Sequence, residues 1–296
     1  MPERREIIGR MELRHRDGRV ITVEVVGDRD ARPVLLCHGL ADSRLAAQPL
    51  EQAARELGLC IIAPDRPGIG GTDRRYLSEL ADWAEDATDV LDALHIDVTA
   101  LLGVSGGGPF AAACAARTPD RVRSLMLVAP LGRPGWPTNG MAPGERLSLM
   151  LATRAPEFGG WSLDRLAALA RRRPDLFLRL AATAQPDADR RALQEAGARE
   201  AFLTSYAEAF RGGSWGVAQD LRVLTRPWGF DLGAIKAPTW VHQGDADTTV
   251  PPRHARLYAE AIPGAQLQMH PGEGHFSIFN HSAELLAPLA SEAPPA

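Results

Sequence analysis

Short apolar runs alternate with longer amphipathic segments along much of the chain. Three of the runs are apolar at nearly every position, at Pro33–Cys37, Leu59–Ala63 and Val122–Val128. Continuous apolar strands are typical of a parallel sheet that is covered on both faces. Segments between them, such as Leu45–Leu57 and Tyr76–Leu94, have the apolar spacing of helices. This rhythm predicts an α/β fold built from βαβ units, with a mostly parallel sheet flanked by helices.

A different pattern comes before the first of these strands. Residues 7–26 alternate between apolar and polar positions, with a turn at Asp17-Gly18. Alternation interrupted by an Asp-Gly turn predicts a two-stranded hairpin.

The strand-helix rhythm stops near Leu131. Residues 131–225 are punctuated by Pro and Gly, have helical character and contain no convincing buried strand. The rhythm then resumes with a strand at 237–242, a helix at 251–261, a strand at 266–270 and a final helix from Phe276. We therefore predict a core made of residues 1–130 and 231–296, and an inserted helical cap at 131–230 that acts as a lid over a site.

The stretch Asp97–Arg117 places a serine between a predicted strand and a predicted helix. An apolar run leads into Gly103-Val104-Ser105-Gly106-Gly107, and an alanine-rich helical run begins at Phe110. Small residues around Ser105 are what a sharp strand-to-helix turn requires, because the two elements pass too close for larger side chains. Such a turn exposes the Oγ atom at a helix N-terminus, whose dipole favours developing negative charge. Ser105 is therefore the candidate nucleophile.

Two later loops contain the groups that a nucleophilic serine needs. A serine requires a general base, and the base requires an orienting carboxylate. The last two predicted strands run into loops that contain Asp245 and Asp247, and then His275. The carboxyl ends of parallel strands share one edge of the sheet, so we expect these side chains to meet Ser105 there.

Backbone groups and aromatic side chains complete the candidate site. An oxyanion hole needs two N–H groups, and Gly106 and Leu40 are placed to supply them, Leu40 from the turn after the first core strand. Trp136 and Trp215 are interpreted first as packing residues of the cap. Together with Phe276, they are also our candidate substrate-binding residues.

With these residues in view, the chain resembles the α/β-hydrolase superfamily, whose esterases, proline iminopeptidases and haloperoxidases are serine enzymes. The matching motifs cover most of 19–131 and 228–281, and they are His38-Gly39, Asp65–Gly70, Gly103–Gly107, Gly244–Pro251 and Gly274-His275-Phe276. In the family pattern G-x-x-D-x-x-V-P the acid is the fourth residue, here Asp247. The resemblance implies Ser105 as nucleophile, His275 as base and Asp247 as orienting acid. It also implies Leu40 and Gly106 as oxyanion donors.

A second G-x-S-x-G string lies at Gly212–Gly216 and is similar to the nucleophile motif of proline iminopeptidases. The residues before it, Tyr206–Phe210 and Arg211, have helical character and do not form an apolar strand. The string therefore lacks the structural context of a nucleophile turn. We interpret Ser214 as part of a turn in the cap.

Composition narrows the classes of partner and location. The net charge of −4 and the absence of a basic cluster argue against nucleic acid. No run approaches about 18 apolar residues, so we expect neither a transmembrane helix nor a membrane partner. The start MPERREIIGR lacks the apolar run of a signal peptide. Cys37, Cys60 and Cys114 lie singly in apolar runs, which indicates packing residues in a reducing, cytoplasmic compartment. No metal-binding or dinucleotide pattern occurs, so we expect no cofactor and no metal.

Taken together, these features predict a cofactor-free serine hydrolase of the carboxylesterase type. Its expected substrate is a small-to-medium, mostly apolar carboxylic ester, cleaved through an acyl-enzyme. Aminopeptidase, lactonase, C–C hydrolase and perhydrolase activities stay open, because they use the same three residues. A non-catalytic ligand-binding module is the alternative from another class, and the complete residue set argues against it. The acyl and alcohol specificity and the oligomeric state are left open by the sequence.

Overall fold

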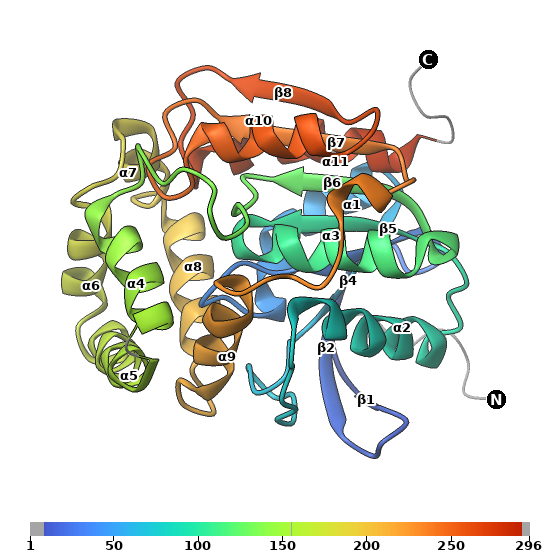
Figure 1. The fold of residues 1–296 in the computed structure, drawn as a ribbon, viewed down its shortest axis with the longest axis horizontal. Helices are drawn as coiled ribbons and strands as arrows, with labels where there is room; N and C mark the ends of the chain where they lie inside the picture. The colour runs from blue at the N-terminus through green and yellow to red at the C-terminus, as the bar shows by residue number, and fades with distance from the viewer. Residues whose placement is uncertain (1–8, 155, 292–296) are drawn as a thin grey trace.

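In residues 9–154 and 156–291, which the computed structural model describes, eight strands form one sheet (Figure 1). The strands are β1 Gly9–Arg14, β2 Val20–Gly27, β3 Arg32–Cys37, β4 Leu59–Pro64, β5 Thr99–Val104, β6 Val122–Val128, β7 Thr239–Gly244 and β8 Gln266–His270. Their order across the sheet is β1-β2-β4-β3-β5-β6-β7-β8. β2 pairs antiparallel with β1 and β4, and the other neighbours pair in parallel. The predicted hairpin and parallel sheet are both confirmed.

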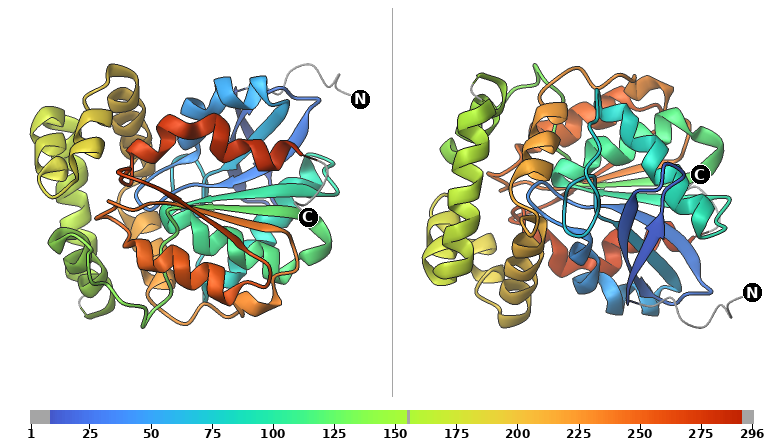
Figure 2. Two further views of the ribbon diagram at one scale, coloured as in Figure 1. Left: turned by 90° about the horizontal axis from the view of Figure 1, so that it is seen from above. Right: turned by 90° about the horizontal axis from the view of Figure 1, so that it is seen from below.

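Helices cover both faces of the sheet and one of its ends. The α-helices are α1 Glu51–Glu56, α2 Trp83–Ala93, α3 Gly108–Arg117, α4 Pro143–Arg154, α5 Pro156–Arg172, α6 Pro174–Ala182, α7 Asp187–Ala192, α8 Ala196–Ala209, α9 Trp215–Leu224, α10 Pro252–Ala261 and α11 Ser282–Ala290. Helices α4–α9, which we call the helical insertion, lie between β6 and β7 in the chain and gather beyond one end of the sheet (Figures 1 and 2). The domain boundaries of the predicted cap stay a prediction.

The sheet is buried on both faces, which explains its continuous apolar strands. In β3, Leu35 and Cys37 join a core cluster that includes residues of α2, α3 and α10. Val34 and Leu36 join a second cluster with residues of α1 and α11. Successive side chains of a strand point to opposite faces, so a strand between two helical layers must be apolar at every position.

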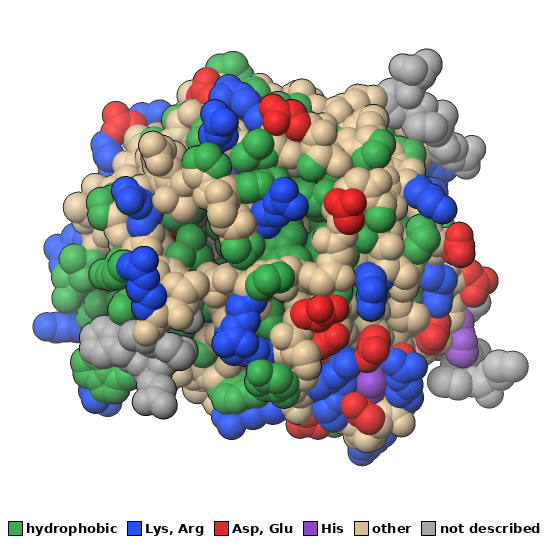
Figure 3. Space-filling view, in the orientation of Figure 1, with side chains coloured by type: hydrophobic (Ala, Val, Ile, Leu, Met, Phe, Trp, Pro, Cys, Tyr) green, Lys and Arg blue, Asp and Glu red, His purple; other side chains and the backbone are tan. Residues whose placement is uncertain are grey.

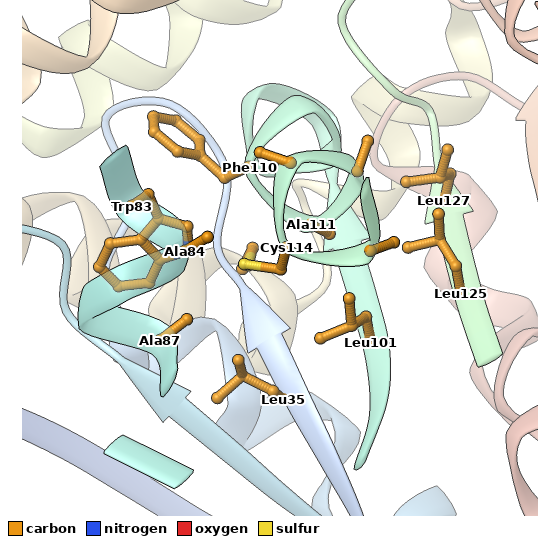
Figure 4. Packing of buried hydrophobic residues seen from close by; sticks show 14 of the residues in the cluster. Leu35, Trp83, Ala84, Ala87, Leu101, Phe110, Ala111, Cys114, Leu125 and Leu127 are labelled. Carbon is orange, nitrogen blue, oxygen red and sulfur yellow. The ribbon is translucent and has the colours of Figure 1, made fainter. Parts of the chain in front are cut away.

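Packing of α3 against the sheet positions the turn at its N-terminus. Figure 4 shows Phe110, Ala111 and Cys114 of α3 beside the sheet, with Trp83 of α2 next to Phe110. The rings of Trp83 and Phe110 meet edge to face with centroids 6.3 Å apart. Small residues on α3 allow a close helix-to-sheet approach, which a tight turn after β5 requires.

Two predicted helices are shorter than their apolar spacing indicated. The segment Leu45–Leu57 begins as a 3₁₀ helix, η2 (Arg44–Leu50), and becomes α-helical only in α1. Pro49 lies inside η2, where its missing N–H and its ring oppose an α-helical turn. In the segment Tyr76–Leu94, α2 begins only at Trp83. Leu77 is fully buried without being helical, and its N–H donates to the side chain of Gln219 in α9 at 3.0 Å.

The three cysteines are packing residues of the core, as the apolar runs around them predict. Cys37, Cys60 and Cys114 are all buried and free of disulfides. No helix in the described part of the chain combines the length and the apolar character needed to span a bilayer.

Candidate active site

Ser105 has a backbone conformation that residues with side chains rarely adopt. Its φ is 53°, in the left-handed region, at the point where β5 ends and the short 3₁₀ helix η4 (Ser105–Gly107) leads into α3. Residues are held there only where the surrounding structure enforces it, and such residues cluster at functional sites. The strained turn that the sequence predicts is therefore present.

Close packing explains why glycines surround this serine. A Cβ atom on Gly107 would lie 2.0 Å from the carbonyl oxygen of Cys37. A Cβ atom on Gly103 would lie 2.7 Å from the Cβ atom of Ala111. Both positions lie where strand, turn and helix touch, so neither tolerates a side chain.

Ser214 lies in a different structural context. It is the N-cap residue of α9, with a φ of −80° in the right-handed helical region, and no strand leads into it. Its N–H donates to the carboxylate of Asp164 at 3.0 Å. The second G-x-S-x-G string is thus an ordinary helix start within the insertion, as the sequence predicts.

The structure brings the candidate base and acid to Ser105. His275 Nε2 lies 3.0 Å from Ser105 Oγ, and His275 Nδ1 lies 2.8 Å from Asp247 Oδ2. Asp247 follows β7 and His275 follows β8, so both come from loops at the carboxyl end of the sheet. His275 and Asp247 are 7% and 3% exposed, which keeps their hydrogen bond out of competition with water.

The hydrogen bonds of Asp247 hold its carboxylate toward His275. Its Oδ1 accepts the N–H groups of Thr249 and Val250, each at 2.8 Å. Its Oδ2, which contacts His275, also accepts from Gln243 Nε2 at 2.8 Å. Asp245 is exposed and instead accepts the N–H of Gly272 at 2.7 Å. Of the two aspartates in this loop, Asp247 is therefore the one that contacts the imidazole.

The electrostatic environment of His275 favours its protonated form. Burial works to lower the pKa of the imidazole, but the charge and the hydrogen bond of Asp247 outweigh it, and the charges of Asp189 and Glu145 add to the effect. The pKa of His275 is consequently raised above its usual value of 6.5. A base with a raised pKa is a stronger proton acceptor, but it is neutral only at higher pH.

This shift leads to a prediction for the pH dependence of hydrolysis. Protonated His275 cannot accept the Ser105 proton, so kcat/KM for a neutral ester should fall by about tenfold per pH unit below the pKa of His275. Because that pKa is raised, the midpoint of the acid limb should lie above pH 6.5. Initial rates in buffers of constant ionic strength measure it, and a midpoint below 6.5 would contradict the environment described for His275.

The proposed oxyanion donors lie next to each other. A Cβ atom on Gly106 would lie 3.0 Å from the backbone nitrogen of Leu40. A Cβ atom on Gly39 would lie 3.7 Å from the Cβ atom of Ser105. The turn after β3 thus packs directly against the serine turn, and the backbones of Leu40 and Gly106 lie side by side.

A buried arginine holds this turn, and sequence reasoning assigned it no role. Arg66 donates to the carbonyls of His38 at 2.6 Å and Gly39 at 2.8 Å. It also forms an ion pair at 2.8 Å with Asp220 of α9, and both side chains are fully buried. Its guanidinium lies 4.4 Å from the ring centroid of Phe110. Arg66 therefore joins its own loop after β4 to the turn after β3 and to the insertion.

Two carboxylates of the insertion also lie against the candidate site, and no sequence pattern points to either of them. Glu145 of α4 is partly buried, and burial raises the pKa of its carboxyl above the usual range, although the charge of His275 opposes the shift. Asp189 of α7 is fully buried and accepts the backbone N–H of His275. Their local sequences, PGERL and PDADRR, are typical of solvated helix starts.

Of the three predicted substrate-binding aromatics, Phe276 has contacts at the site. Its ring meets those of His275 and Phe202, each with centroids 5.4 Å apart. Phe202 belongs to an aromatic group of the insertion that also contains Phe177, Tyr206 and Phe210. Phe276 thus places one aromatic ring beside the imidazole and joins it to this group.

The two tryptophans, Trp136 and Trp215, pack against other parts of the core. Trp136 packs on Tyr258 and His254 of α10, with ring centroids 5.1 and 6.0 Å away. Trp215 packs against Gly68 and Arg74 of the loop after β4. The packing roles are observed, whereas substrate binding by either tryptophan stays a prediction.

A cavity of about 710 Å³ opens between α4 and the core, beside the segment that follows β6. Its lining includes Leu131, Arg133, Trp136, Arg146, Arg154 and His254, with no acidic residue. Ser105 and His275 do not line it, but the N–H of Leu131 donates to the Ser105 carbonyl at 3.0 Å. Figure 3 shows this face of the molecule hollowed between the insertion and the core, with hydrophobic side chains deep in the hollow and basic ones around it.

One group of described side chains has the composition of a metal site. Ligand atoms of His270, His281 and Glu284 lie within 4.8 Å of one another. The same rings already have protein partners, since His270 Nε2 contacts His242 at 3.0 Å and His281 Nε2 contacts Glu273 at 3.1 Å. These contacts explain the cluster as a hydrogen-bonded network that joins β8 to the start of α11.

Comparison with known proteins identifies the family. A family model described as the alpha/beta hydrolase fold matches residues 32–282, most of the chain. The chain belongs to the alpha/beta hydrolase fold family. The family assignment agrees with the mostly parallel sheet and with the turn at Ser105.

Two curated relatives of this α/β-hydrolase are named as a hydrolase and a depolymerase. Over 240 residues it is 30% identical to 2-hydroxymuconate semialdehyde hydrolase of Pseudomonas putida, covering 79% of this chain and 77% of the relative. It is 28% identical over 258 residues to poly(3-hydroxyalkanoate) depolymerase of Ectopseudomonas oleovorans, covering 87% and 82%. The solved bromoperoxidase of Bacillus anthracis matches with a TM-score of 0.70 at 21% identity, covering 94% of this chain and 97% of that one. That structural likeness shows the fold alone.

Proposed function

We propose that this α/β-hydrolase is a cofactor-free serine hydrolase that cleaves small-to-medium, mostly apolar carboxylic esters. The observation that carries the proposal is the hydrogen-bonded series from Ser105 Oγ through the His275 imidazole to Asp247, with distances of 3.0 and 2.8 Å. The left-handed backbone at Ser105 adds to it. A nucleophile, a base and an orienting acid in this order are sufficient for acyl transfer.

The proposed reaction has two half-reactions of the same kind. Ser105 Oγ attacks the ester carbonyl carbon while His275 Nε2 takes its proton, and Asp247 stabilises the imidazolium that forms. The N–H groups of Leu40 and Gly106 bind the oxyanion. The tetrahedral intermediate expels the alcohol, which takes the proton from His275, and an acyl-enzyme is left. Water then attacks the acyl group by the same route and releases the acid.

Two observations favour an apolar ester as the substrate. The ring of Phe276 gives the site an apolar surface next to the imidazole, and Phe202 packs on that ring. The depolymerase relative is named for a substrate that is a polyester of hydroxy acids. Apolar walls bind acyl and alkyl groups by burying their surface, whereas a charged substrate would lose hydration there.

The test is hydrolysis of p-nitrophenyl acetate and butyrate, together with labelling by a fluorophosphonate probe. We expect p-nitrophenolate release, with a burst where deacylation is the slower step, and one probe adduct on Ser105. A parallel assay with the matching p-nitroanilides separates ester from amide hydrolysis. If neither turnover nor labelling occurs, the protein is a non-catalytic ligand-binding module and the proposal is wrong.

C–C bond hydrolysis is the second candidate, and one comparison favours it. The relative at 30% identity is a 2-hydroxymuconate semialdehyde hydrolase, named for an anionic substrate. The cavity beside Leu131 is lined by three arginines and no acid, which suits an anion. The rate at which 2-hydroxymuconate semialdehyde is consumed can be measured from the loss of its absorbance. This rate should be compared with the rate of ester hydrolysis by the same preparation. The larger kcat/KM decides between the two.

A further inference from the structure

A carboxylate of the helical insertion holds the backbone of the loop that carries the base. Asp189 Oδ2 accepts the N–H of His275 at 2.8 Å. Its Oδ1 accepts the N–H groups of Phe276 at 2.8 Å and Ser277 at 2.9 Å. One side chain of α7 therefore binds three successive amides, beginning with that of His275 itself.

The charge of Asp189 has no cationic partner among the described residues. Its side chain is fully buried, and no basic group of residues 9–154 or 156–291 lies within ion-pair distance of it. The next residue, Arg190, contacts Asp187 and the carbonyl of Gln185 instead. A buried carboxylate is tolerated when several N–H groups bind it, so the three amides serve as its partners. The three amides thus stabilise the buried carboxylate of Asp189, and the carboxylate in turn holds the backbone of the loop.

The loop has a shape that admits this carboxylate. A Cβ atom on Gly274 would lie 2.3 Å from Asp189 Oδ2, so a side chain there would displace it. The N–H of Gly274 is already bound by Ser277 Oγ at 2.8 Å. Glycine before His275 is therefore needed for the approach of the insertion as well as for the local turn.

The same part of the insertion also contacts the loop of the acid. Gln185 Nε2 donates to Thr249 Oγ1 at 3.0 Å, and Thr248 Oγ1 donates to the carbonyl of Ala184 at 3.0 Å. Ala184, Gln185 and Asp189 together therefore bind both loops that bring Asp247 and His275 together. The two loops leave different strands, so a third segment that touches both limits their relative movement.

We propose that Asp189 is a positioning residue for His275, so that the insertion and not the core alone sets the place of the base. This inference rests on the proposed function, because the role of His275 as base does. The base must stay within hydrogen-bonding distance of Ser105, and small displacements of such groups are costly to catalysis.

The charge on Asp189 acts on His275 as well. The charged groups that face the imidazole are Asp247 of the loop after β7, Glu145 of α4 and Asp189 of α7. Burial lowers the pKa of His275, and these three carboxylates raise it. Loss of one negative charge should therefore lower the pKa of His275 and shift the acid limb of kcat/KM to lower pH.

Asp189→Asn tests the inference, with Asp187→Asn as its matched control. Asparagine keeps the shape but has one acceptor oxygen, so its amide group must face at least one of the three N–H groups. Asp187 lies on the same helix, and its side chain is 71% exposed, so its variant loses the same charge without touching the loop. We expect kcat to fall by about 10- to 100-fold in Asp189→Asn, with KM little changed, and neither to change in Asp187→Asn.

Measurements independent of turnover keep the result interpretable. The pKa of His275, followed by NMR of the imidazole and assigned with His275→Gln, should be lower in Asp189→Asn than in Asp187→Asn. If wild type does not hydrolyse esters, the proposed function fails while this comparison still tests Asp189. Should Asp189→Asn misfold by circular dichroism, Asp189→Ser, whose smaller side chain leaves room for water at the amides, takes its place. Equal kcat and equal His275 pKa in a folded Asp189 variant and in Asp187→Asn would overturn the inference.

Discussion

Replacing Ser105 with alanine is expected to lower kcat/KM for p-nitrophenyl butyrate by about 10⁴-fold or more. The variant loses the Oγ atom that lies 3.0 Å from His275 Nε2, and no acyl-enzyme can form without it. Alanine is also a residue with a Cβ atom, so the left-handed turn with its φ of 53° is not relieved by the change. Steady-state rates and loss of the fluorophosphonate adduct measure the effect.

Ser214→Ala is the control for this prediction, because Ser214 stands in the other G-x-S-x-G string. Its position at the start of α9 gives it no contact with the candidate base, so the variant should keep its rate within about twofold of wild type. Loss of activity in Ser214→Ala together with full activity in Ser105→Ala would show that the nucleophile has been assigned to the wrong string.

Asp247→Asn is expected to lower kcat by about 10³- to 10⁴-fold while leaving the fold intact. Asparagine can still accept the N–H groups of Thr249 and Val250 through its oxygen. Its amide nitrogen would then face His275 Nδ1 and would favour the tautomer in which Nε2 carries the proton. An imidazole in that tautomer cannot accept the Ser105 proton. Steady-state rates and a thermal melting curve separate lost catalysis from lost stability.

The matched change at the neighbouring aspartate tests the assignment of the acid. The Asp245 side chain is exposed and accepts the N–H of Gly272 in the loop after β8, so Asp245→Asn should lose little activity. A larger loss of activity in Asp245→Asn than in Asp247→Asn would show that Asp245, and not Asp247, is the orienting acid.

Much of this protein could be predicted because its determinants are local. The apolar runs of β3 to β6 reflect a sheet buried on both faces, and that requirement acts on every position of a strand. The nucleophile turn is encoded by Gly103 and Gly107, where a Cβ atom would lie only 2.7 and 2.0 Å from neighbouring atoms. Helix starts are harder to predict, because Leu77 lies in a non-helical segment and is nevertheless buried at a position that fits helical spacing.

The residues that the sequence did not reveal act over long separations. Arg66 meets Asp220 across 154 positions of the chain, and Asp189 meets His275 across 86. Their local sequences are those of solvated loops and helix starts, so burial and partners are properties of the assembled fold. The place of Phe276 beside His275 makes it a candidate from sequence, but residue spacing does not reveal its contact with Phe202 of the insertion.

By itself, the sequence determined the α/β class, the strained turn at Ser105 and the set of loops from which a base and an acid could come. These features follow from periodicity, glycine placement and the shared edge of parallel strands. Only the tertiary structure decided that His275 lies 3.0 Å from Ser105, and that α7 of the insertion holds its loop through Asp189. Hydrogen bonds between distant segments depend on distances of a few tenths of an ångström, and residue patterns do not encode such distances.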